Sequence, residues 1–242
     1  MSHKATVFSP VGTPLLDRTV GELVAERPGR SRVFQGFRID FCCQGARTLR
    51  EACELKGIAS ASVVEQLEAE SAAPADEGNP ASLPPADLAD YINRRHHGYL
   101  KKELPRLFMM AQRVAQVHGS HNGSLIELFH VFSELDAELV SHLQKEEEIL
   151  FPAISAMAAQ PAEKVVLEGP IACMLDEHDH AGQALARLRE LSNDFQPPAE
   201  ACNTYRALFA GLRDLEEDLH KHIHLENSVL FPAARRMAAA GV

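Results

Sequence analysis

Apolar side chains recur at steps of three and four residues through most of the chain, a spacing that places them on one face of an α-helix. The pattern is sustained in four stretches, at about residues 86–117, 124–158, 165–191 and 199–239. The breaks between these stretches contain Gly119, Gly123, Pro161, Pro197 and Pro198. Four long helices with short connections predict an up-down four-helix bundle.

Shorter helical patterns precede the bundle, at about residues 19–27, 31–37, 48–56 and 60–70. A proline-rich stretch with few apolar residues follows them and has the composition of a linker. The chain lacks the runs of Val, Ile and Thr that are typical of strands. We therefore expect an all-α protein with a small helical domain at residues 1–70, a linker at 71–86 and the bundle at 87–242.

We call the series of apolar residues along one face of a helix its apolar ladder. In the second and fourth long helices, His and Glu continue the ladder without a change in spacing. The ladder of the second helix runs through Leu128, Phe132, Leu135, Leu139, His142, Glu146 and Ile149. The ladder of the fourth runs through Leu208, Leu212, Leu215, Leu219, His222, Glu226 and Val229. Burying a carboxylate is costly unless it is paired or bound to a metal. Two helices that each direct a His and a Glu inwards therefore predict a metal site.

The first and third long helices each add one histidine to their apolar lines, His97 before Leu100 and His178 after Leu175. A single histidine on an apolar face is usually a hydrogen-bonded core residue, but ligand-type residues on all four ladders favour a metal. The predicted ligands are His97, His142, Glu146, His178, His222 and Glu226. This set suits two iron ions, with two imidazoles on each and with both glutamates and an oxo or hydroxo group as bridges.

Each His–Glu pair belongs to a repeated segment, which reads His, three residues, Glu, three residues, Leu-Phe-Pro. The copies occupy residues 142–152 and 222–232. We expect Phe151 and Phe231 to pack, and Pro152 and Pro232 to kink or adjust the helices beyond the site.

Other acidic and imidazole groups offer a competing site. Glu127 with His130, and Glu217 with His220, have the Glu-x-x-His spacing of ferritin-like carboxylate sites, but neither pair lies on its ladder. The remaining histidines are expected at the surface or behind the ligands: His96, His118, His121, His180 and His224. Three acids near the ligands could support them, although solvated charge is their more common role: Glu138, Glu177 and Asp179.

The five cysteines include an adjacent pair, Cys42 and Cys43, and do not form a disulfide framework. Residues 39–45 break the helical spacing and end in glycine, which predicts that this pair lies on a turn or at a helix N-terminus. Two interpretations stay open: exposed, reactive thiols that could bind a metal transiently, or two small buried residues. The other three, Cys53, Cys173 and Cys202, fall on helical patterns and are expected to be structural.

The formal net charge of −10, with no block of Lys and Arg to offset it, argues against a nucleic-acid partner. The N-terminus has no apolar leader, and no run approaches the roughly 18 apolar residues of a membrane span. We expect a cytoplasmic protein without a membrane partner, either a monomer or a homodimer.

The His97 line, the two His-x3-Glu segments and Glu177-His178-Asp179 resemble the hemerythrin-like bundle. Residues 40–45, Asp-Phe-Cys-Cys-Gln-Gly, resemble the N-terminal module of the iron–sulfur cluster repair family, the repair-of-iron-centres or ScdA/YtfE group. The resemblance covers nearly the whole chain. It implies a non-haem di-iron protein of the bacterial cytoplasm, induced by nitrosative or oxidative stress, that restores damaged iron–sulfur proteins by delivering iron. The family's ligands fall on the same six residues, and its cysteine pair on Cys42 and Cys43.

Oxygen-carrying hemerythrins use five histidines, one Glu and one Asp, whereas the ladders here give four histidines and two Glu. Fewer imidazoles are expected to hold iron less tightly, which suits release. An alternative is a nitric oxide or oxygen buffer or sensor that uses the same site. Nitric oxide reduction is a third hypothesis, but the sequence shows no electron supply, so we expect a metal donor or binding protein rather than a turnover enzyme.

Overall fold

The computed structural model describes residues 12–72, 78–159 and 166–240. Helices make up most of these residues, and none of them belongs to a β-strand. An isolated bridge pairs Thr19 with Thr48. The prediction of an all-α fold is confirmed.

The chain forms two compact units. The bundle unit comprises Ile92–Pro152 and Ala172–Leu219. The terminal unit comprises Met1–Tyr91, Ala153–Ile171 and His220–Val242.

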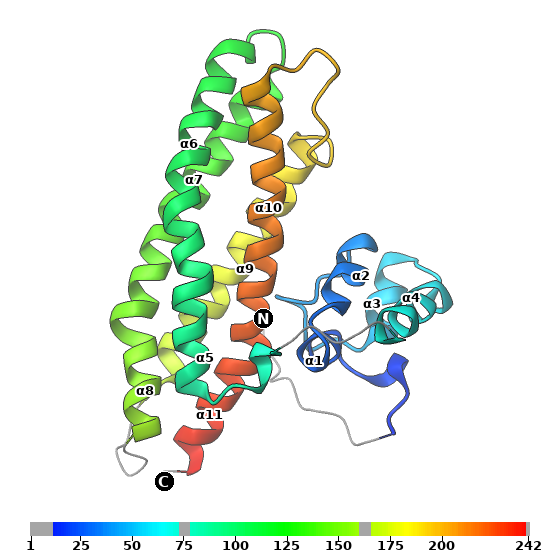
Figure 1. Ribbon diagram of the computed structural model, residues 1–242, viewed down its shortest axis with the longest axis vertical. Coiled ribbons are helices and arrows are strands. Elements are labelled where there is room, and N and C mark those ends of the chain that lie inside the picture. The colour runs from blue at the N-terminus through cyan, green and yellow to red at the C-terminus, as the bar shows by residue number, and fades with distance from the viewer. Residues whose placement is uncertain (1–11, 73–77, 160–165, 241–242) are drawn as a thin grey trace. The chain divides into compact units, whose positions relative to one another are not determined.

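The bundle unit contains four long helices, which Figure 1 shows side by side with successive helices running in opposite directions. They are α6 (Gly98–His118), α7 (Ser124–Lys145), most of α9 (Glu168–Leu191) and most of α10 (Asn203–Leu225). Their apolar ladders form the core: Leu107, Phe132, Leu185 and Leu212 are each at most 1% exposed. The predicted up-down four-helix bundle is therefore confirmed.

Three of the four predicted long helices are divided by a π-helical turn. The turns are Asn93–His97, Glu146–Leu150 and Glu226–Leu230. The first joins α5 (Pro85–Ile92) to α6, the second joins α7 to α8 (Phe151–Ala159), and the third joins α10 to α11 (Phe231–Ala240). In the last two, the amide of Phe151 or Phe231 donates to the carbonyl five residues earlier, on Glu146 or Glu226. Pro152 and Pro232 follow directly, where the chain has no amide to donate.

The π turns correct the predicted ladders beyond the two glutamates. The uninterrupted pattern placed Ile149 and Val229 in the core, but Ile149 is 57% exposed and Val229 is half-buried. Leu150 and Leu230 are buried instead, at 1% and 0% exposure. A π turn inserts one extra residue into the helix, so the next core position moves one residue along.

The N-terminal part of the terminal unit contains four short helices. They are α1 (Val20–Glu26), α2 (Arg30–Gly36), α3 (Leu49–Lys56) and α4 (Ser60–Ala72), with 3-10 turns at Leu15–Asp17 and Pro80–Ser82. The hydroxyl of Thr19 accepts the Glu22 amide at the start of α1, and Thr48 forms a capping box with Glu51 at the start of α3. Both helices therefore begin where the sequence indicated. Residues 73–77 of the predicted linker lie outside the described residues.

Candidate metal centre

Four predicted ligands lie in the bundle unit, on four helical segments. His97 ends the first π turn, His142 lies in the last turn of α7, Glu146 opens the second π turn, and His178 lies in α9. None of the four is more than 4% exposed. Every π turn in the described part of the chain contains one predicted ligand, which agrees with the frequent occurrence of π turns at functional sites.

The ring nitrogens of these histidines converge on one carboxylate. His97 Nε2 and His142 Nε2 each lie 3.3 Å from Oε2 of Glu146. His178 Nε2 lies 3.2 Å from His142 Nε2. The rings of His142 and His178 are tilted, with centroids 4.9 Å apart. One glutamate oxygen is therefore the meeting point of two imidazoles, and a third imidazole adjoins them.

The opposite edges of two rings are held by carboxylates that are themselves paired with lysines. His97 Nδ1 donates to Glu147 at 2.8 Å, and Lys101 donates to the other oxygen of Glu147 at 2.7 Å. His142 Nδ1 donates to Glu177, also at 2.8 Å, and Lys145 donates to the other oxygen of Glu177. The same His–carboxylate–Lys arrangement thus occurs twice.

Hydrogen bonding keeps both supporting carboxylates ionised. The bond from His142, together with Lys145, lowers the pKa of Glu177 to about 2, against the opposing effect of burial. Burial is the largest single influence on Glu147, but the bonds from Lys101 and His97 outweigh it together and lower its pKa. Glu177 in turn raises the pKa of Lys145. Glu147 and Glu177 are therefore negatively charged at neutral pH, each on the Nδ1 side of an imidazole ring.

This geometry fits a bound cation. A carboxylate oxygen only accepts, so the Nδ1 of His97 and of His142 carries the proton, and in the neutral ring Nε2 then presents a lone pair to Glu146. That lone pair and the negatively charged carboxylate of Glu146 repel each other. A cation bound between them attracts both. Two donors bonded about 2.1 Å from one ion at roughly 90–110° lie about 3.0–3.4 Å apart. The separations of 3.2 and 3.3 Å fall within that range.

His222 and Glu226 form the remaining pair. They lie one turn apart where α10 passes into the third π turn, at 1% and 0% exposure, with 3.1 Å between Nε2 and Oε1. Within the bundle unit, His142, Glu146 and His178 each bring one ligand atom within 4.8 Å of the others, and all three are buried. His222 and Glu226 belong to the terminal unit.

Two family models match the chain. Residues 88–234 match the hemerythrin HHE cation binding domain, and residues 16–71 match ScdA_N, a domain of unknown function. The chain is 39% identical over 221 residues to the iron-sulfur cluster repair protein YtfE of Musicola paradisiaca, a match that covers 91% of this chain and 97% of that protein. Proteins of the same name from Pectobacterium atrosepticum and Escherichia coli are each 38% identical, over 91% and 90% of this chain and 97% and 96% of their own.

The chain belongs to this iron–sulfur cluster repair family. Its hemerythrin match and its buried His and Glu cluster indicate metal binding. No helix within the described residues is long and apolar enough to cross a membrane.

In this member of the repair family, the structure also shows where the histidines outside the apolar ladders lie. His121, His130 and His180 are exposed, and His118 is half-buried. Glu127 and Glu217 are also exposed, so the ferritin-like alternative is wrong. Glu138 is exposed as well.

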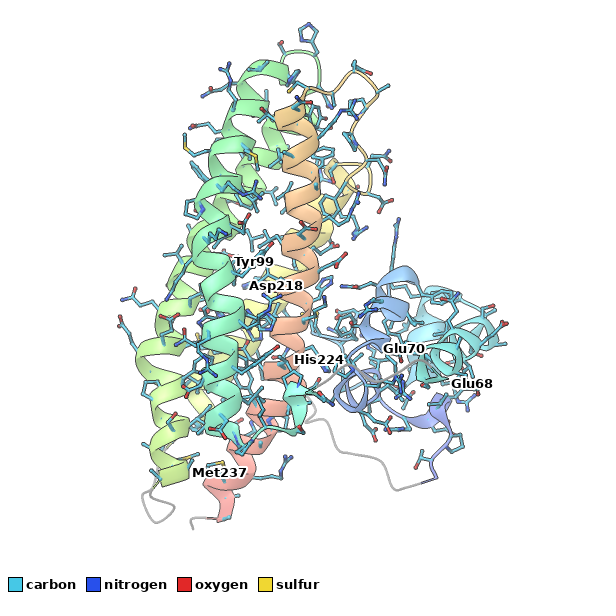
Figure 2. All side chains as sticks on the ribbon, viewed as in Figure 1. Glu68, Glu70, Tyr99, Asp218, His224 and Met237 are labelled. Atoms are coloured by element: carbon cyan, nitrogen blue, oxygen red, sulfur yellow. The ribbon has the colours of Figure 1, made fainter. Side chains whose placement is uncertain are left out.

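His96 and His224 are buried, so the surface alternative is wrong for both. His96 is 4% exposed and its Nδ1 donates to Asp218 at 3.0 Å; Figure 2 labels Asp218 on α10, with Tyr99 on α6. His96 lies in the first π turn, where neighbouring side chains do not follow the angles of an α-helix.

His224, labelled on α10 in Figure 2, is 3% exposed, and burial lowers its pKa to about 4. Its ring stacks edgewise on Phe41 from the N-terminal part of the terminal unit.

The cysteine pair lies on a turn, as predicted, and its two members differ in burial. Cys42 is 3% exposed, whereas Cys43 is half-buried. A contact with Cys43, burial and the nearby Asp40 raise the pKa of Cys42 well above its usual value, so its thiol is protonated at neutral pH. The prediction that the other cysteines are structural holds for Cys53, which is buried in α3. Cys173, in α9, and Cys202, directly before α10, are exposed instead, so the prediction is wrong for both.

Proposed function

We propose that this protein is a di-iron protein that repairs damaged iron–sulfur clusters by donating iron. The observation that carries the proposal is the convergence of His97 Nε2 and His142 Nε2 on one oxygen of Glu146, with each Nδ1 held by an ionised carboxylate. The name shared by the relatives, iron-sulfur cluster repair protein, supports the biological role.

The proposed ligands are His97, His142, Glu146, His178, His222 and Glu226. Iron would supply a redox-active, exchangeable cation at this site. The chain's own contribution is orientation: Glu147 and Glu177 fix the ring tautomers, and Lys101 and Lys145 hold those carboxylates in place. With four imidazoles instead of the five of an oxygen carrier, the site is suited to release iron.

The division into a domain at residues 1–70, a linker at 71–86 and a bundle at 87–242 also stays a proposal. The cellular setting is a proposal too: a cytoplasmic stress protein, monomeric or homodimeric, with damaged iron–sulfur proteins as partners.

Metal analysis with absorption spectroscopy of the purified protein tests the metal. We expect two irons per chain and the absorption bands of an oxo-bridged diferric centre. Zinc, or no metal, overturns the proposal. Iron donation is tested by mixing the iron-loaded protein with an enzyme whose iron–sulfur cluster has been damaged by nitric oxide. We expect recovery of that enzyme's activity with the native protein and none with His142→Ala.

A nitric oxide buffer or sensor is the second candidate, because the same buried site could bind a small ligand. The two functions differ in their use of the thiols. In iron donation the module that carries Cys42 and Cys43 passes iron to the damaged protein, whereas a buffer or sensor does not need these thiols. If the double variant Cys42→Ala/Cys43→Ala repairs clusters as well as the native protein and still binds nitric oxide, donation through a cysteine-bearing module loses its support.

A further inference from the structure

The turn that contains the cysteine pair brings three metal-ligand types together outside the bundle. Asp40, Cys42 and Cys43 place one ligand atom each within 4.8 Å of the others. The two Sγ atoms are 3.7 Å apart, and Cys42 Sγ lies 3.4 Å from Oδ1 of Asp40. All three residues belong to the terminal unit.

These distances do not suit a disulfide. Adjacent Cα atoms are about 3.8 Å apart across a trans peptide, below the roughly 4.4–6.8 Å that disulfides span. A tetrahedral metal fits better. Two thiolates bonded about 2.3 Å from one such ion lie about 3.8 Å apart, and a thiolate and a carboxylate oxygen lie about 3.6 Å apart. The observed 3.7 and 3.4 Å are close to both values.

The turn is also held in its conformation by bonds on both sides. Oδ1 of Asp40 accepts the backbone amides of Cys42, Cys43 and Gln44 at 3.1, 2.9 and 3.3 Å. Asn227, in the third π turn, donates its side-chain amide to the carbonyl of Cys42 at 3.0 Å. Both thiols and the carboxylate are therefore positioned without a metal, which reduces the entropy lost when an ion binds.

We propose that Asp40, Cys42 and Cys43 form a second metal site, which binds one thiophilic divalent cation. Two thiolates suit such an ion, and Asp40 balances its remaining charge. Binding replaces two thiol protons, which pass to solvent, and no electron moves. Three protein ligands leave a fourth position for water or for a group of another protein, so the ion can be exchanged. The identity of the ion in the cell, Fe2+ as cargo, rests on the proposed function.

An anaerobic titration with Co2+ tests the site, because thiolate-bound cobalt gives a charge-transfer band in the near ultraviolet. The full-length protein is first loaded with iron, and Co2+ is then added. We expect one equivalent of Co2+ to bind with a thiolate band and with the intense visible bands of tetrahedral cobalt. The absence of any thiolate band overturns the proposal.

Substitutions assign the band to these residues. Cys42→Ser and Cys43→Ser should each abolish it, whereas the double variant Cys173→Ser/Cys202→Ser, which removes the two exposed thiols, should retain it. Asp40→Asn keeps an oxygen that can accept the three amides but removes the charge; we expect it to keep a thiolate band with affinity reduced roughly 10-fold or more. A band that persists in both Cys42→Ser and Cys43→Ser contradicts the assignment. Circular dichroism confirms that each variant is folded, and Cys43→Ala replaces Cys43→Ser if the serine variant is not.

The test of the Asp40, Cys42 and Cys43 site can be distinguished from the test of the di-iron site. His142→Ala should lose bundle iron and keep the cobalt–thiolate band. Cys43→Ser should keep two irons and lose the band. If iron is absent from the native protein but the band appears, the second site stands and only the identification of its ion as iron cargo fails.

Discussion

Glu177 accepts the Nδ1 proton of His142 at 2.8 Å, on the edge of the ring opposite Glu146. This bond fixes which nitrogen of His142 carries the proton, and so directs the lone pair of Nε2 to the proposed metal. Glu147 does the same for His97. Since both acids lie on the outer side of the rings, their contribution to metal affinity can be measured without removing a ligand.

Glu177→Gln should weaken iron binding roughly 10- to 100-fold while leaving the iron count at saturation unchanged. The glutamine oxygen can still accept from His142, but it lacks the charge that makes the imidazole a stronger donor and that pairs with Lys145. Competition with a chelator of known affinity measures the change. Glu147→Gln should behave in the same way, because its contacts are equivalent.

Glu148→Gln is the matched control for these two variants. Glu148 lies in the same π turn as Glu147 but is exposed, and its side chain accepts a hydrogen bond from Gln144 rather than from a ligand. Its substitution should leave the chelator competition unchanged. If all three variants bind iron equally well, the supporting role of Glu147 and Glu177 is wrong.

His142→Ala and Glu226→Ala should each lose iron while keeping the helical content, because each removes a proposed ligand from a helix whose apolar contacts remain. Metal analysis and far-ultraviolet circular dichroism give the two readings. His130→Ala and His220→Ala should keep iron, since neither is a proposed ligand. Loss of iron from His130→Ala, whose side chain is exposed, would point to a different site.

The spacing of apolar residues was enough to predict the bundle, because each ladder up to its ligand follows the geometry of a regular α-helix. Leu139 and His142, and likewise Leu219 and His222, are buried as that geometry requires. The prediction failed beyond Glu146 and Glu226, where the helix departs from its period. A π turn is set by backbone hydrogen bonds that residue types specify weakly, although the repeated Leu-Phe-Pro marks its end.

Residues whose burial depends on contacts distant in sequence were also missed. His224 is covered by Phe41, which lies far from it along the chain, so no ladder in α10 could show its burial. Glu147 was missed because its role depends on its bond to His97, and the sequence showed only an acidic run there. Glu177 was named among the acids that could support the ligands, and its bond to His142 agrees with that prediction.

The shifted register gives a prediction that separates the π turn from an uninterrupted helix. Leu150→Ala should lower the free energy of unfolding by about 2–5 kcal/mol, because Leu150 is 1% exposed and its loss leaves a cavity. Ile149→Ala should change it by no more than about 0.5 kcal/mol, because Ile149 is 57% exposed. Urea denaturation of both variants in the iron-free state measures the difference. The opposite order would show that the helix continues without a π turn.

The contact between the cysteine turn and the third π turn depends on two glycines. A Cβ on Gly45 would lie 2.8 Å from the carbonyl oxygen of Phe41 and 3.0 Å from the hydroxyl of Ser228. A Cβ on Gly21 would lie 2.5 Å from the same hydroxyl and 2.9 Å from the carbonyl oxygen of Gly45. Because backbone atoms limit the space at both positions, rotation of the Ser228 side chain cannot relieve either clash fully.

Gly45→Ala should therefore destabilise this part of the terminal unit by about 1–3 kcal/mol, the usual effect of overpacking a close contact. Hydrogen exchange should show faster exchange of amides in α1, while amides in the centres of α6 and α7 keep their protection because their core is unchanged. Gly36→Ala is the control: its Cβ meets nothing within 4 Å, and alanine in a helix is neutral or stabilising by up to about 1 kcal/mol. Equal protection of α1 in the Gly45→Ala and Gly36→Ala variants would mean that the cysteine turn does not pack closely against the π turn.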